Sequence, residues 1–282
     1  MHKSNLPVGV FDSGLGGLTA VREIKKIMPG ESIVYFGDTG RLPYGTRSPE
    51  IIKKYACDDM NFLLTNSVKS VLIACGTVSS TALEVIKRNF NVPVIGVVDP
   101  ASQKACEVSK TGKIAVLATP STIRTGSFDK AIKAINPDAC VMGVGCPMFV
   151  PLVENGYISR DCEITKKIAA EYISKLFSFS PDTIILGCTH YPLIKGVVRD
   201  SAREVLGKEV SVIDSGSCAA EALKSFLAAE NLSNNSDTEG VCKYFVSDQP
   251  YNFSEIASRF LGERVSDVKQ ISIDDYLYQS GH

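Results

Sequence analysis

Two cysteines in this sequence stand where a thiol can exchange protons with a substrate. Cys75 and Cys188 each follow a short apolar run, and a threonine follows each within two residues. We expect a helix to begin after each of them, and a helix N-terminus lowers the pKa of a thiol from its usual value of about 8.5. One such cysteine is most often a small buried side chain. Two cysteines in the same setting favour a chemical role.

Two thiols suit a racemase better than other thiol enzymes. In that reaction one residue removes a proton from one face of a carbon, and the other returns a proton to the opposite face. The roles exchange when the reaction runs backwards. Two thiols that flank a substrate are also too far apart for a disulfide. A single reactive thiol would instead suit a hydrolase, a decarboxylase or a redox sensor.

Other polar residues are expected near the same strand ends. Asp12 and Ser13 follow an apolar run at 8–11 and precede a glycine-rich turn, SGLGG, which lacks the dinucleotide fingerprint. They either bind an anionic group with the following helix N-terminus or only cap that helix. His190 is the one histidine away from the chain ends, beside Cys188, where it either handles protons or is satisfied by backbone groups. Glu154 alone would be interpreted as a solvated acid.

A turn-rich loop at 37–49 contains Tyr44 and Gly45. Ordered loops near strand ends often line binding sites, although this one could be only a connection.

The elements that position these residues alternate along the chain. Helical patterns separate short, continuously apolar runs, which are typical of parallel strands covered on both faces. The expected strands are 8–11, 32–37, 70–74, 92–98, 113–118, 139–144, 182–187 and 210–214, with a final strand-like segment at 241–248. The fold class is therefore α/β with mostly parallel sheets, and ligands in such folds bind beyond the carboxyl ends of the strands.

A weak internal repeat suggests two similar lobes. Residues 70–86 and 182–198 share one plan, in which an apolar strand precedes a small residue, a cysteine, a threonine and the start of a helix. Chance similarity between βα units is the alternative explanation.

Composition excludes several classes of protein. The 282 residues carry 30 Lys and Arg against 31 Asp and Glu, so nothing favours nucleic acid as a partner. No apolar run approaches the length of about 18 residues that a membrane span needs, and no signal-peptide core is apparent, so we expect a cytoplasmic protein without a membrane partner. The nine cysteines are odd in number and none form C-x-x-C, which argues against a disulfide framework or a zinc site.

Five segments of the chain, in order, resemble the glutamate racemases of the aspartate/glutamate racemase superfamily. They are FDSGLGGLTAVREI, YFGDTGRLPYGTRS, CGT, PLVENG and LGCTHYPLI, and the resemblance covers roughly residues 8–262. It implies interconversion of L- and D-glutamate without pyridoxal phosphate, metal or other cofactor, which supplies D-glutamate for peptidoglycan.

The resemblance also implies roles for single residues. Cys75 would deprotonate D-glutamate and Cys188 would deprotonate L-glutamate, supported by Asp12, Glu154 and His190. The implied substrate contacts are Asp12, Ser13, Tyr44, Gly45, Gly76, Thr77, Thr189 and His190, with Thr119 and Thr122 as further hydroxyls. The implied fold has one lobe from 1–98 plus 209–282 and another from 99–208, with the active site in the cleft between them. We expect a homodimer.

One position departs from the family pattern. The family usually has Cys-Asn-Thr where this chain has Cys75-Gly76-Thr77. Removal of a buried polar partner of the substrate costs about 1–3 kcal/mol, so we expect weaker substrate binding or altered specificity. His190 favours glutamate over aspartate, because aspartate racemases tend to place Glu at its position.

Three alternatives remain open on the sequence. The first alternative is a racemase of another amino acid such as aspartate. The second is a non-catalytic binding or regulatory relative, and some such relatives are thought to inhibit DNA gyrase. The third is a thiol redox sensor that uses Cys75 or Cys188.

Overall fold

The computed structural model describes residues 2–236, 238–249, 253–265 and 267–277, and it divides into two compact units. The first unit comprises Met1–Gly96 and Ala219–His282, and the second comprises Val97–Cys218. Both are α/β units with parallel sheets, so the predicted fold class is confirmed.

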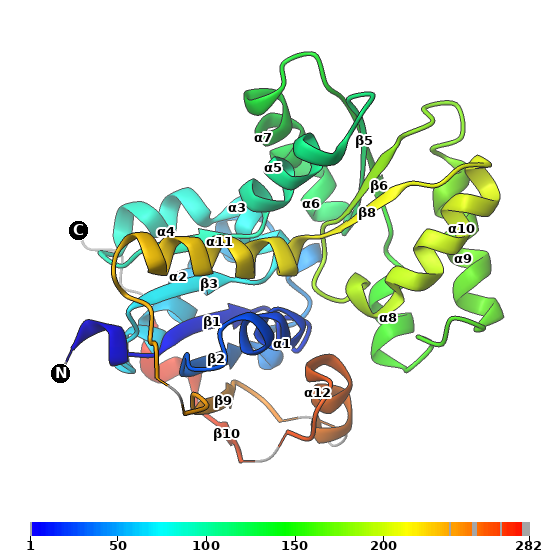
Figure 1. The fold of residues 1–282 in the computed structure, drawn as a ribbon. Coiled ribbons are helices and arrows are strands. Elements are labelled where there is room, and N and C mark those ends of the chain that lie inside the picture. The colour runs from blue at the N-terminus through cyan, green and yellow to red at the C-terminus, as the bar shows by residue number, and fades with distance from the viewer. Residues whose placement is uncertain (1, 237, 250–252, 266, 278–282) are drawn as a thin grey trace. The chain divides into compact units, whose positions relative to one another are not determined.

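The first unit is built on a six-stranded parallel sheet with the order β10-β9-β2-β1-β3-β4 (Figure 1). Its strands are β1 (Val8–Asp12), β2 (Ile33–Gly37), β3 (Ser70–Ile73), β4 (Val94–Gly96), β9 (Cys242–Val246) and β10 (Val268–Gln270). Every residue of β1, β2 and β3 is buried, which explains their continuously apolar sequences. The central position of β1 places its last residue, Asp12, next to the ends of β2 and β3.

Helices cover this sheet and connect its strands. They are α1 (Leu18–Ile27), α2 (Pro49–Thr65), α3 (Gly76–Thr81), α4 (Leu83–Asn89) and α12 (Phe253–Leu261), with 3-10 turns η1 (Lys3–Asn5), η2 (Thr39–Arg41), η3 (Tyr44–Thr46) and η5 (Ile273–Tyr276). The start of α2 follows from its sequence, because Ser48 accepts a hydrogen bond from the Ile51 N–H and proline occupies the first helical position. Phe62 of α2 then packs on Phe36 of β2, with ring centroids 4.8 Å apart.

The second unit has a four-stranded parallel sheet with the order β6-β5-β7-β8. Its strands are β5 (Lys113–Ala118), β6 (Cys140–Gly145), β7 (Thr183–Leu186) and β8 (Ser211–Asp214). Its helices are α5 (Val98–Val108), α6 (Pro120–Thr125), α7 (Ser127–Ile135), α8 (Phe149–Glu154), α9 (Glu163–Ser174), η4 (Tyr191–Ile194) and α10 (Lys195–Leu206). Within this unit α5 packs beside α7, and α9 beside α10 (Figure 1).

The unit boundaries differ from the expected ones. The family resemblance implied divisions after residues 98 and 208, whereas the chain divides after Gly96 and after Cys218, within α11 (Ser215–Ala229). The second difference arises because β8 hydrogen-bonds to β7 and so belongs to the second sheet.

The strand expected over 92–98 was too long. The structure confines β4 to Val94–Gly96 and begins α5 at Val98. Pro100 lies in the first turn of α5, where no backbone N–H is needed, so proline does not prevent a helix from starting at Val98. The apolar run continues across the change from strand to helix and therefore did not reveal it. None of the helices in the described ranges has both the length and the apolar character of a membrane span.

Candidate active site

Cys75 lies just beyond the end of β3 and caps the N-terminus of α3. Its side chain is buried, and its Sγ lies 3.4 Å from the Ser13 hydroxyl, with which it hydrogen-bonds. Gly76 and Thr77 form the first turn of α3 and are also buried. The first unit therefore brings together Cys75 and Ser13, which are 62 residues apart in the chain.

The Cys75 thiol is held in its protonated form. Burial, and then the nearby Asp12 carboxylate, raise its pKa to about 12, although hydrogen bonds from Ser13 and the Val78 backbone oppose the shift. The expectation of a lowered pKa at this helix N-terminus was wrong for Cys75. The six-residue α3 adds little dipole, and desolvation disfavours the thiolate more than the helix end favours it.

Asp12 is held in place by close backbone packing. It is buried, and its Oδ2 accepts a hydrogen bond from the Gly14 N–H at 3.1 Å. A Cβ atom at Gly17 would lie 2.5 Å from the Asp12 Cβ, and one at Gly37 would lie 2.3 Å from the Gly14 carbonyl oxygen. The N-cap of α1 is Gly17, so the interpretation of Asp12 as that cap is wrong. The glycines are required because the turn packs against Asp12 and the end of β2.

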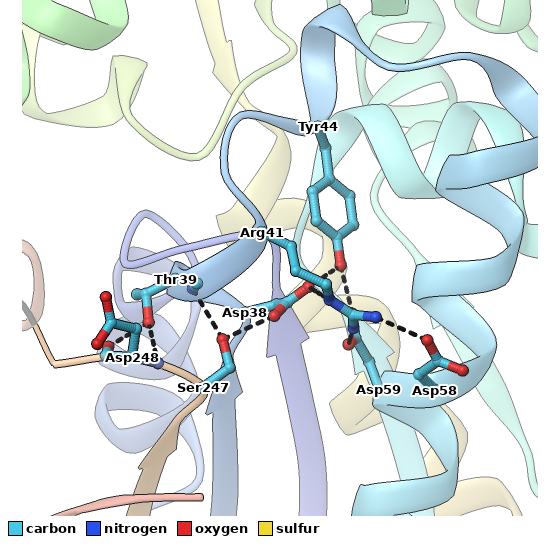
Figure 2. Close-up of polar contacts among 9 residues, drawn as sticks. Asp38, Thr39, Arg41, Tyr44, Asp58, Asp59, Ser247 and Asp248 are labelled. Carbon is cyan, nitrogen blue, oxygen red and sulfur yellow. Dashed lines mark hydrogen bonds and ion pairs between the residues drawn. The ribbon is translucent and has the colours of Figure 1, made fainter. Parts of the chain in front are cut away.

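Tyr44 lies in the turn η3, but its hydroxyl faces the protein interior. The side chain is 1% exposed, and its hydroxyl contacts Asp38 and Asp59, the latter at 3.1 Å (Figure 2). A substrate contact from this turn would therefore use backbone groups of Tyr44 and Gly45 rather than the phenol.

Cys188 is the corresponding thiol of the second unit. It follows β7, is 7% exposed, and its Sγ lies 3.9 Å from His190 Nδ1. The Nε2 of His190 lies 3.0 Å from Glu154 Oε1 at the end of α8. The structure thus joins Cys188, His190 and Glu154 in one hydrogen-bonded series. The helix expected directly after Cys188 is a 3-10 helix that starts at Tyr191, and α10 begins only at Lys195.

His190 favours its protonated form in this series. Burial lowers its pKa, but the hydrogen bonds to Cys188 and Glu154 outweigh that effect and bring the pKa to about 10. With both ring nitrogens protonated, His190 donates to the sulfur of Cys188 and to the carboxylate of Glu154. A protonated imidazole beside a sulfur is a common way to stabilise a thiolate.

Aromatic packing holds the two halves of this series together. Phe149 of α8 contacts the ring of Tyr191 edge-on at 5.0 Å, and the Tyr191 hydroxyl donates to the Cys146 carbonyl at 2.9 Å. This packing fixes α8, which carries Glu154, against the turn that follows His190. Sequence reasoning missed Tyr191, and its place beside the Cys-Thr-His motif was the only signal available.

The threonines of the second unit have local partners. Thr119 caps α6 by accepting from the Thr122 N–H, and the two hydroxyls lie 3.0 Å apart. Thr189 is buried, and its Oγ1 lies 3.4 Å from His190 Nδ1. Within the ranges that the structure describes, no three His, Cys, Asp or Glu side chains are arranged to hold a metal ion.

Sequence reasoning also missed a buried charged cluster beside Tyr44. Arg41 contacts three buried aspartates, Asp38, Asp58 and Asp59. The pair of acids within the largely apolar α2 was the signal that could have revealed it.

Two α/β units, each with a parallel sheet and a thiol beside acid–base groups, define an enzyme suited to proton transfer at carbon. A family model for Asp/Glu/Hydantoin racemase matches residues 19–223. The chain belongs to this racemase family.

Glutamate racemases are among the similar proteins. The glutamate racemase of Geobacter metallireducens is 41% identical, across 95% of this chain and 97% of its own. The crystal structure of Francisella tularensis glutamate racemase with D-glutamate has a TM-score of 0.88 and 35% identity, covering 97% of this chain and 100% of that one. A glutamate racemase from Bacillus anthracis has a TM-score of 0.88 and 32% identity, covering 95% and 98%.

Proposed function

We propose that this chain is a glutamate racemase that interconverts L- and D-glutamate by proton transfer between the substrate α-carbon and two thiols. The observation that carries the proposal is the repeated placement of a buried thiol just after a parallel strand, once in each unit, with a polar hydrogen-bond partner. The 41% identity to a glutamate racemase and the D-glutamate complex of the Francisella relative support glutamate as the substrate.

The environments of the two thiols suggest how the reaction begins. Cys188 faces a protonated His190, which places a hydrogen-bond donor and a positive charge beside the sulfur that would remove the α-proton of L-glutamate. Cys75 keeps its proton because burial and Asp12 raise its pKa, so it can donate to the opposite face of the carbanion. In the reverse direction Cys75 is the base and Cys188 is the acid.

Supporting groups account for the rest of the catalytic effect. Positioned acids and bases supply about 10²–10⁴-fold, so stabilisation of the developing negative charge must supply more. Asp12 and Glu154 act through the groups they contact, while Ser13, Gly45, Gly76, Thr77 and Thr189 offer hydrogen bonds to the substrate. We infer a cytoplasmic homodimer that supplies D-glutamate for peptidoglycan.

Deuterium exchange tests the reaction and its substrate together. The protein, dialysed against chelator, is incubated in D2O with L-glutamate while optical rotation and deuterium at Cα are followed. L-Aspartate and a Cys75→Ser/Cys188→Ser double variant serve as controls. We expect loss of optical rotation with deuterium incorporation for glutamate only, and only with both thiols present. Exchange with aspartate at an equal rate would refute the specificity, and no exchange with either would favour the non-catalytic relative.

A further inference from the structure

A buried cluster of unequal charge lies beside the Tyr44–Gly45 turn (Figure 2). Arg41 contacts Asp38 at 2.6 Å, Asp58 at 2.6 Å and Asp59 at 2.8 Å, and all three carboxylates have side chains with 0% exposure. Within the described residues, Arg41 is the cation that contacts all three acids. If all three were ionised, three negative charges would be buried around one guanidinium, which is costly without water.

The position of the Tyr44 hydroxyl shows where a proton can reduce that charge. It contacts an oxygen of Asp38 and an oxygen of Asp59. A phenol has only one proton to donate, so two separate, well-aligned hydrogen bonds require one carboxyl group to donate its own proton to the phenol oxygen. The other oxygen of Asp59 accepts from Arg41 at 2.8 Å, which leaves the oxygen facing Tyr44 to carry the proton.

The charges around Asp59 favour the same assignment. Burial, and then the Asp38 carboxylate, raise the pKa of Asp59 well above its usual value, with Asp58 adding to the shift. Arg41, and a hydrogen bond that Tyr44 would donate to ionised Asp59, oppose this shift. With Asp59 protonated, donor and acceptor of that contact exchange, so the hydrogen bonds run from Asp59 to Tyr44 and from Tyr44 to Asp38.

Asp38 connects this series to a distant part of the chain. Its Oδ1 accepts from the Ser247 hydroxyl at 2.7 Å, and the same hydroxyl accepts from the Gly40 N–H at 2.8 Å. Next to it, the Asp248 N–H donates to Thr39 at 3.0 Å. Residues that follow β9 therefore hold the start of the loop, while α2 holds Tyr44 through Asp59.

We propose that Asp59, in its protonated form, and Asp38 are positioning residues that fix the Tyr44–Gly45 turn for substrate binding through the Tyr44 hydroxyl. The effect on substrate rests on the proposed racemase function, whereas the proton on Asp59 can be measured without substrate. Neither carboxyl needs to touch glutamate, because Tyr44 carries the effect to the backbone of the turn.

Removal of one hydroxyl tests the positioning role. In Tyr44→Phe the ring can still pack on Tyr55, whose centroid is 5.4 Å away, but the hydrogen bonds to both carboxyl groups are removed. We expect KM for L-glutamate to rise about tenfold with kcat changed less than about twofold, since the net effect is that of about one hydrogen bond. Tyr55→Phe is the matched control, because the Tyr55 ring packs on Tyr44 and Arg41, and its KM should not change. Equal KM values in both variants would overturn the proposal.

Isosteric replacement tests the proton on Asp59. In Asp59→Asn the amide N–H₂ can donate to Tyr44 while its oxygen accepts from Arg41, so KM should match the wild type. Asp59→Ala should raise KM like Tyr44→Phe. A rise in Asp59→Asn as large as that in Asp59→Ala would show that an ionised carboxylate is needed and would refute the assignment.

Stability against pH provides a readout that does not depend on activity. A carboxyl whose pKa is raised on folding contributes most below its unfolded value of about 3.9, and this contribution is lost as pH rises towards the folded value. Between about pH 5 and about pH 8 the urea midpoint of the wild type should therefore fall more than that of Asp59→Asn. Parallel curves would overturn the protonated Asp59, whereas an inactive wild type with diverging curves would refute only the racemase function.

Discussion

At the scale of single residues, the two thiols have similar sequence contexts but differ in the charged and titratable groups beside them. Burial and a carboxylate raise the pKa of Cys75, whereas Cys188 faces an imidazole whose own pKa is raised to about 10. Such opposite environments are how enzymes keep one group as the acid and another as the base at the same pH.

Glu154 should control the alkaline limit of activity through His190. The hydrogen bond at 3.0 Å helps to hold the proton on His190 up to about pH 10. Because the Glu154 side chain is 38% exposed and partly screened, Glu154→Gln should move the alkaline limb of kcat/KM down by about one pH unit or less. Rates for L-glutamate between about pH 7 and about pH 11 measure this shift. Glu163→Gln removes an exposed acid of the same unit, and a shift as large in that control would contradict the role of Glu154.

Gly76 tests whether the missing family asparagine limits binding. A side-chain amide that gains one hydrogen bond to glutamate should lower KM about tenfold in Gly76→Asn. Steady-state kinetics with L- and D-glutamate measure the change. If neither KM nor kcat changes, the departure from the family pattern has no effect on binding.

At the scale of elements, close packing around two glycines determines the conformation of the turn between β1 and α1. Gly17 and Gly37 leave no room for a side chain, and this packing sets the position of Asp12 beside Cys75. The Tyr35 hydroxyl adds a hydrogen bond to the Gly14 carbonyl at 2.7 Å from the neighbouring strand. The carboxyl ends of β1 and β2 thus form one rigid support for the candidate site.

Gly17→Ala should damage both stability and activity. The new methyl would lie 2.5 Å from the Asp12 Cβ, so we expect a decrease of about 1–3 kcal/mol in the free energy of unfolding and a lower kcat. Gly14→Ala is the control, because the atoms nearest its methyl would belong to the Leu42 side chain, at 3.2 Å, and Leu42 is partly exposed and can move. Urea unfolding and racemase assays compare the two variants. A larger effect at Gly14 would contradict this interpretation of the turn.

At the scale of the whole molecule, the first unit is assembled from both ends of the chain. A buried ion pair joins its parts, because Lys69 Nζ donates to Glu31 at 2.5 Å, to the Ser4 carbonyl at 2.7 Å and to the Leu232 carbonyl at 2.8 Å. Glu31 also accepts from the Asn234 N–H at 2.7 Å. Segments near residues 4, 31 and 69 and a segment near residue 232 thus meet at one ammonium group.

Lys69→Met should destabilise the protein strongly. It leaves Glu31 buried without its cation, and a broken buried pair costs about 3–5 kcal/mol. The control is Arg160→Met, which removes an exposed pair with Asp200 and should change the urea midpoint little, because water screens that pair. Urea unfolding of both variants measures the difference. Equal decreases in stability would show that the buried pair has no special role in joining the unit.

Much of the fold was predictable because strands and helices follow local patterns. The apolar runs at 8–11 and 70–74 closely match β1 and β3. The short strand β10 was not predicted, because only its pairing with β9 distinguishes Val268–Gln270 from a loop. The partners of Asp38 were equally unpredictable, since its hydrogen bond to Ser247 spans 209 residues.

The sequence by itself determined which residues follow the strands, and so it identified Cys75, Cys188, Asp12 and His190 as candidates for one type of chemistry. Spacing along the chain carries that information, because the end of a strand is a local property. The tertiary structure alone decided the proton on Cys75, the inward direction of the Tyr44 hydroxyl and the sheet to which β8 belongs. These depend on burial and on charges from distant segments, which come together only when the chain folds.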